Sequence, residues 1–163
     1  MILWFKMIFH TNYYIFYHLS FVLLLLMGHI YVHGINKVVT KVHPRSYAPE
    51  KLFESITNSK NYIYHNTSRP LDVVLLHAPW CWRGHCTKEE ESVGWQTAWS
   101  QLEALKEAEE VHAIGVSNFD ERNLKELLDI SNKKVSVVQN WMDPYHQDRV
   151  VREMCTANGI VYM

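Results

Sequence analysis

Short β-branched runs alternate with amphipathic helical patterns from Ile35 to the end of the chain. Continuous apolar runs, such as residues 71–77, are typical of strands that are covered on both faces. Windows with apolar residues three and four positions apart are typical of helices that bury one side. This alternation predicts βαβ units and a parallel sheet, so we expect an α/β fold rather than a series of hairpins.

The same pattern places four strand-helix repeats. Strands are predicted at 37–41, 71–77, 111–116 and 135–138, with a final short strand at 160–163. Helices are predicted at 49–57, 94–109, 121–130 and 147–158. Their ends carry the expected signals, with Pro49 in a first turn, Asn118 or Asp120 as a cap, and Gly159 as a C-cap glycine. Periodicity alone fits either an open sheet or part of an eight-stranded barrel.

The first 34 residues have a different character, because Lys6 is the only charged residue before Lys37. Residues 13–32 are about as long and apolar as a bilayer-spanning helix, which needs roughly 20 residues. We therefore expect a boundary near Gly34, with residues 1–34 as an apolar segment and a candidate membrane anchor. The alternative is sequence unrelated to the domain at 35–163, and localisation stays open between the cytoplasm and a membrane.

Composition narrows the function classes. A hydrophobic content of 48% predicts a folded core. Sixteen basic and seventeen acidic residues leave a charge of −1 without a basic run, so no nucleic-acid partner is expected. Three cysteines argue against a disulfide framework and favour a reduced compartment. Two of them share a loop with two histidines, but their spacing is unlike the usual zinc spacing, and no metal site is predicted. These loop residues are His77, Cys81, His85 and Cys86.

Polar side chains follow the predicted strands, where an α/β fold places its functional site. They are Lys41, His77, Ser117 with Asn118, and Gln139 with Asn140. A cation, a neutral hydrogen-bonding group and several amides on one rim suit carbonyl chemistry with a nicotinamide. Taken singly, each has an ordinary interpretation as a solvated lysine, a loop histidine or a helix cap.

Taken together, four motifs resemble the aldo-keto reductase family. They are VVTK at 38–41, LDVVLLHAP at 71–79, AIGVSNFD at 113–120, and VVQN with DPY at 137–145. The most specific is IGVSNF followed about twenty residues later by VVQN. The resemblance implies a partial (β/α)₈ TIM barrel containing about strands three to seven.

The resemblance also implies a chemistry, which is the NAD(P)H-dependent reduction of an aldehyde or ketone in a small-molecule carbonyl substrate. It implies that Lys41 is the catalytic lysine and that His77 orients the substrate carbonyl. It further implies that Ser117, Asn118 and Gln139 contact the nicotinamide carboxamide. Trp80 and Trp82, which follow His77 in the same loop, are expected to line the substrate pocket.

Two parts of the family pattern are missing from this sequence. The tyrosine that delivers the proton and its partner aspartate come from earlier strands in that family, and here no carboxylate precedes Glu50. The aromatic that stacks on the nicotinamide and the adenosine-phosphate cluster would follow Met163. We therefore expect a truncated form that is inactive, with NADP (NADPH) binding weak or lost. The alternative is a non-catalytic fragment or a membrane-tethered binding module.

A piece of a barrel also leaves two sheet edges and one face without their usual partners. We expect this interior face to carry six apolar residues, and we expect self-association to cover it. The six residues are Val38, Val74, Leu76, Ile114, Val116 and Val138.

Overall fold

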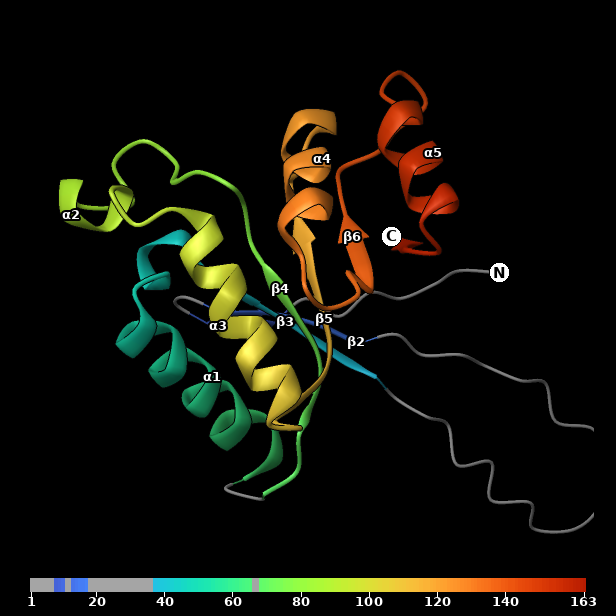
Figure 1. The fold of residues 1–163 in the computed structure, drawn as a ribbon. Helices are drawn as coiled ribbons and strands as arrows, with labels where there is room; N and C mark the ends of the chain where they lie inside the picture. The colour runs from blue at the N-terminus through green and yellow to red at the C-terminus, as the bar shows by residue number, and fades with distance from the viewer. Residues whose placement is uncertain (1–7, 11–12, 18–36, 66–67) are drawn as a thin grey trace, which may run out of the picture.

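The computed structural model describes residues 8–10, 13–17, 37–65 and 68–163, and Figure 1 shows helices packed against a sheet. Two short strands come first, β1 (Ile8–His10) and β2 (Tyr13–Tyr17). Strands and helices then alternate as predicted. They are β3 (Val38–Val42), η1 (Pro44–Ser46), α1 (Pro49–Tyr64), β4 (Leu71–Leu76), α2 (Lys88–Glu91), α3 (Trp95–Glu107), β5 (Val111–Ser117), α4 (Glu121–Ile130), β6 (Val137–Gln139), α5 (Arg149–Ala157) and β7 (Val161–Tyr162).

The sheet order is β1-β2-β3-β4-β5-β6-β7, and the pairs from β3 to β7 are all parallel. Five parallel strands in sequence order, joined by helices, confirm the predicted α/β fold of partial-barrel type. The pairing of β2 with β3 is antiparallel, with Phe16 opposite Val39, and so departs from the parallel pattern. Self-association stays a prediction.

The helices bury one face of this sheet. In Figure 1, α1 and α3 lie side by side over β3, β4 and β5. Trp99 and Leu102 from α3 are at most 1% exposed and belong to one cluster with side chains of the strands and the other helices. Helix α1 continues past its predicted end at Thr57 to Tyr64. It does so because Ile63 and Tyr64 still pack against that core.

The strand residues expected to face a barrel interior lie on the opposite side. Val74, Leu76, Ile114, Val116 and Val138 all belong to the core cluster that the helices cover. The prediction of their direction is therefore wrong. A separate small cluster contains Val39, Leu75 and Val137, which alternate with them along the strands and so define the other face.

The predicted membrane-spanning segment at 13–32 is not supported. Its first five residues, Tyr13–Tyr17, form strand β2 rather than the start of a helix. Residues 18–32 lie outside the described part of the chain. Within the described ranges, no helix is long and apolar enough to cross a membrane.

Candidate functional site

The carboxyl ends of four neighbouring strands bring four polar residues to one face of the sheet. Strand pairing aligns Lys41 with Leu75, and Ser117 with Gln139. Successive side chains alternate between faces, so a residue two positions after a member of the Val39 cluster shares its face. Lys41, His77 and Gln139 lie two positions after the cluster members Val39, Leu75 and Val137. Ser117 lies two positions after Gly115, which pairs with Leu75 and whose Cβ position would face the Leu75 side chain. All four lie on the face away from the helices.

Lys41 and Ser117 are in direct contact. Lys41 Nζ donates a hydrogen bond to Ser117 Oγ at 3.3 Å, across 76 positions of sequence. Burial lowers the pKa of the Lys41 ammonium to about 8. Near neutral pH this lysine therefore holds its proton less firmly than an exposed lysine would, which is the property a proton-moving lysine needs.

His77 is a neutral imidazole at neutral pH. Its pKa is lowered to about 4, mainly by burial and in smaller part by the neighbouring Lys41 and His43. Its ring meets the ring of Trp82 edge to face at a centroid distance of 4.8 Å. Trp82 thus lies beside His77, whereas the side chain of Trp80 is 49% exposed. A neutral histidine in this position can hydrogen-bond to a polar ligand without repelling Lys41.

Asn118 connects the ends of three strands. Its backbone has a φ of 58°, in the left-handed region that asparagine tolerates better than most residues. Its backbone N–H donates to Gln139 O at 3.1 Å, and its side-chain Nδ2 donates to His77 O at 2.8 Å and to Ser117 Oγ at 3.2 Å. Because Nδ2 already donates twice within the protein, Oδ1 is the side-chain atom through which Asn118 could contact a ligand.

Two amide oxygens at the end of β6 are buried and lack a hydrogen bond. Gln139 Oε1 and Asn140 Oδ1 have no partner among the residues that the structure describes. Asn140 Nδ2, by contrast, donates to Phe119 O at 2.7 Å and to Asp148 Oδ2 at 2.8 Å. A buried acceptor without a donor is costly, so these oxygens fit a site completed by a ligand's N–H groups.

The loop after β4 contains a disulfide between Cys81 and Cys86, with Cα atoms 6.1 Å apart. The cysteine count argued against a disulfide framework, and the structure has this one short-range disulfide among the described residues, with Cys155 free. The local cause is a turn in which His85 N–H donates to Trp82 O at 2.9 Å and Gly84 has a φ of 81°. Such a turn brings its two flanking residues together, and glycine adopts this φ without strain.

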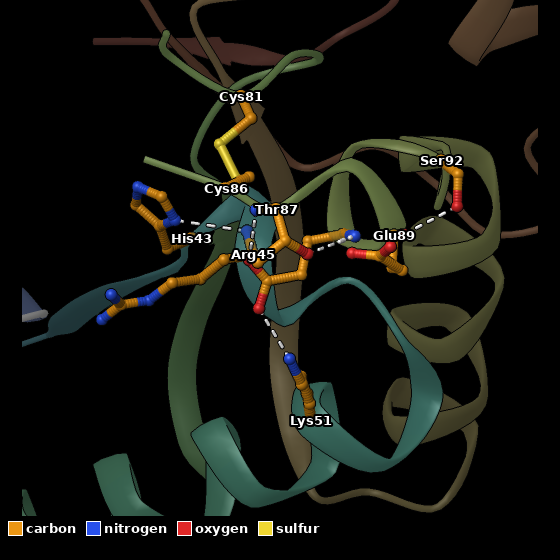
Figure 2. A network of polar contacts seen from close by, with 9 residues as sticks. His43, Arg45, Lys51, Cys81, Cys86, Thr87, Glu89 and Ser92 are labelled. Atoms are coloured by element: carbon orange, nitrogen blue, oxygen red, sulfur yellow. Dashed lines mark hydrogen bonds and ion pairs between the residues drawn. A yellow bond between two sulfur atoms is a disulfide. The ribbon is translucent and has the colours of Figure 1, made fainter. Parts of the chain in front are cut away.

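His43 lies next to this disulfide, as Figure 2 shows. It follows β3 directly and accepts a hydrogen bond at Nδ1 from the backbone N–H of Arg45 at 3.2 Å. Its ring centroid is 6.0 Å from that of His77. Sequence reasoning missed His43, although its position two residues after the predicted strand at 37–41 was a usable signal.

A groove of about 880 Å³ lies away from these strand ends. Its walls come from α5 and the residues around it, including Arg149, Arg152 and Tyr162. The candidate site is therefore recognised by its converging side chains rather than by this groove, which none of the predicted site residues lines.

Parallel strands with polar side chains gathered at their carboxyl ends have the plan of a (β/α)₈ barrel enzyme. The chain belongs to the aldo/keto reductase family, whose match covers residues 36–163. It is 40% identical over 62 residues to the 9,11-endoperoxide prostaglandin H2 reductase of Trypanosoma cruzi, covering 38% of this chain and 22% of that protein. It is 29% identical over 99 residues to aldo-keto reductase family 1 member A1 of Cricetulus griseus, covering 55% and 31%.

Solved structures give the same fold. Aldose reductase from Giardia lamblia matches with a TM-score of 0.66 and 26% identity, over 76% of this chain and 43% of that one. An aldo-keto reductase complexed with NADPH matches with a TM-score of 0.67 and 23% identity, over 76% and 36%. The chain thus spans 22% and 31% of the two curated relatives, and less than half of either solved chain.

Proposed function

We propose that the barrel to which residues 36–163 contribute is an NAD(P)H-dependent oxidoreductase that reduces aldehyde or ketone carbonyls. The observation that carries the proposal is the convergence of four strand-end side chains on one face, with Lys41 Nζ 3.3 Å from Ser117 Oγ. Membership of the aldo/keto reductase family and the likeness to a member complexed with NADPH support the general chemistry.

In this proposal Lys41 and His77 act on the substrate. A neutral His77 donates a hydrogen bond to the carbonyl oxygen and so fixes its orientation. Lys41, whose pKa is about 8, stabilises the negative charge that develops on that oxygen and eases the arrival of a proton there. The nicotinamide, when bound, would supply the hydride to the carbonyl carbon.

The residues at the ends of β5 and β6 fit a nicotinamide carboxamide. Gln139 Oε1 is a buried acceptor that needs a donor, and the carboxamide offers an NH₂ group. Ser117 Oγ already accepts from Lys41 and Asn118, so its own hydroxyl proton is left to donate to the carboxamide oxygen. Asn118 would contribute its Oδ1. NADP(H) is therefore the cofactor that we propose for this edge.

Binding can be tested without turnover by saturation-transfer NMR between the 163-residue chain and NADPH. We expect transfer to the nicotinamide protons and its loss in Gln139→Leu, which keeps the side-chain volume but removes the amide. Gln96→Leu is the matched control, because Gln96 is exposed on α3 and bonds to Glu126. Equal transfer to the nicotinamide in both variants would remove the support for Gln139 as a cofactor contact.

Residues 1–163 on their own are a second candidate, as a binding module without turnover. No Asp or Glu precedes Glu50, so the sequence has no acidic residue at the place where the family resemblance would put the catalytic aspartate. Three tyrosine hydroxyls of the described region donate elsewhere, Tyr47 to Ala78 O, and Tyr64 and Tyr162 to Asp72 and Asp148. Steady aldehyde-dependent oxidation of NADPH by the purified chain would refute this candidate. Absence of that activity in a longer chain with the remaining strands would refute carbonyl reduction itself.

A further inference from the structure

We propose that the loop between β4 and α2 is a redox-gated zinc site. When the Cys81–Cys86 disulfide is reduced, His43, Cys81 and Cys86 bind one Zn²⁺ ion. Neither the carbonyl chemistry nor the cofactor contacts proposed above use these three residues, so the zinc site stands or falls independently of them.

The positions of the ligand atoms carry the inference. One nitrogen of His43 and the sulfurs of Cys81 and Cys86 all lie within 4.8 Å of one another, and all three residues are partly buried. A tetrahedral zinc ion binds thiolates at about 2.3 Å and imidazole nitrogens at about 2.0–2.1 Å. Two thiolates on one zinc are then roughly 3.8 Å apart. Opening the S–S bond by side-chain rotation is enough to reach that spacing from a Cα separation of 6.1 Å.

The backbone around the loop holds these ligands in place. Gly84 allows the turn that returns Cys86 to Cys81. Immediately after Cys86, Thr87 and Glu90 form a reciprocal capping box at the start of α2. Lys51 of α1 pairs with Glu90 at 2.6 Å, which ties this end of the loop to the helix layer. A site built on such supports needs little rearrangement to accept an ion.

The hydrogen bond of His43 fixes the tautomer of its neutral ring. Nδ1 accepts from the backbone N–H of Arg45, so the lone pair is on Nδ1 and the ring proton is on Nε2. Zinc would take over this lone pair, and the Arg45 bond would be exchanged for a metal bond. Two cysteines and one histidine are a ligand set that zinc accepts with a water molecule in the fourth position.

Thiol-disulfide exchange at Cys81 and Cys86 controls whether the loop can bind zinc. A dithiol reductant gives two electrons and two protons to the Cys81–Cys86 bond and becomes a disulfide. The two thiols then release their protons when zinc binds the thiolates. In the oxidised loop no thiolate exists, so the two states exclude each other. The loop contacts the candidate catalytic residue, because Trp82 within it lies 4.8 Å from the ring of His77.

The test uses the complete 163-residue chain and Co²⁺ as a spectroscopic probe. After reduction with a phosphine, which takes up oxygen from water as the disulfide is reduced, we expect one equivalent of Co²⁺ to give thiolate-to-cobalt absorption that Zn²⁺ abolishes. The oxidised chain should show none. Cys86→Ser and His43→Gln should weaken binding by more than about 100-fold, since even second-shell contacts to a metal are worth 10–100-fold. Cys155→Ala and His112→Gln are the matched controls and should bind as the parent does.

A second measurement needs no variant. In the reduced parent chain, Zn²⁺ should protect Cys81 and Cys86 from alkylation, as read by mass spectrometry of the peptide that contains them. The proposal is overturned if the reduced parent gives no thiolate-to-cobalt absorption, if zinc leaves both cysteines reactive, or if a folded His43→Gln chain keeps the parent affinity.

Discussion

The two faces of the sheet carry different kinds of side chain. The helix-covered face is filled by large apolar side chains such as Trp99, Leu102 and Ile114, each at most 1% exposed. The other face has a small apolar cluster of Val39, Leu75 and Val137, and the next residues on that face are polar. Neighbouring residues of a strand point to opposite faces of the sheet. A single strand can therefore place apolar side chains in the core and polar side chains in the candidate site.

The difference also appears in the electrostatics. Asp72 at the start of β4 is buried but receives hydrogen bonds from Lys37 and from the backbone N–H of Val38, so its charge is compensated. Lys41 and His77 at the opposite ends of the strands have pKa values lowered mainly by burial. Perturbed groups that converge at strand ends are typical of functional sites.

The largest expected effect is a loss of the helix-covered core. Trp99→Ala removes a buried indole, and we expect the free energy of unfolding to fall by about 3–5 kcal/mol. Phe53→Ala is the control, because Phe53 in α1 is 60% exposed. Its change should stay within about 0.5 kcal/mol. Urea unfolding followed by circular dichroism measures the unfolding free energy of both variants. Similar losses in the two variants would contradict the expectation that only the buried position stabilises the fold.

Gly115→Ala tests how tightly the opposite face is packed. A Cβ at this position would lie 2.1 Å from Val137 O and 2.9 Å from Leu75 Cδ2, so β5 and β6 must move apart. We expect a loss of about 1–3 kcal/mol in unfolding free energy. His112→Ala, an exposed change in the same strand, should be nearly neutral. A neutral Gly115→Ala would show that the polar face tolerates extra volume.

Two substitutions at Asn118 distinguish the effect of its backbone conformation on stability from that of its side-chain hydrogen bonds. Alanine at this left-handed position loses the bonds to His77 O and Ser117 Oγ and also strains the backbone. Glycine loses the same bonds without that strain. We expect Asn118→Gly to be more stable than Asn118→Ala by about 1 kcal/mol. Thermal unfolding of both variants measures this, and equal stability would mean that the φ of 58° imposes no cost.

We also expect the stability of the fold to depend on pH through His77. The pKa of His77 is about 4 in the folded chain, against an ordinary value of 6.5, and the groups facing it are Lys41 and His43. Between these two pH values the unfolded chain binds a proton that the folded chain does not, so stability rises with pH across this window and is complete above it. His77→Gln should flatten that rise. Melting temperatures from pH 4 to 7 of both chains provide the measurement, and identical slopes would contradict the shift.

The sequence by itself determined the order of strands and helices and the polar residues that end the strands. Element order and strand-end residues are local properties of the sequence. The periodicity of a strand or helix can be seen in a short stretch of residues, and the capping residues lie at the ends of that stretch. The helix at 121–130 was predicted with its observed bounds, and Asp120 caps it through a hydrogen bond to Asn123 N–H. The family motifs fall on these same local elements.

Only the tertiary structure decided which strand side chains point toward the helices and which residues come into contact at the strand ends. Residues 73–76 are all apolar, so this run gives no sign that Val74 packs against helices while Leu75 does not. The contact between Lys41 and Ser117 depends on strand register across 76 positions. The Cys81–Cys86 pair and its neighbour His43 likewise depend on a turn and on the parallel pairing of β3 with β4. The hydrophobic periodicity of a segment depends only on residues that are close in sequence. Strand register and the direction in which the side chains of a strand point are fixed only when separate elements pack together.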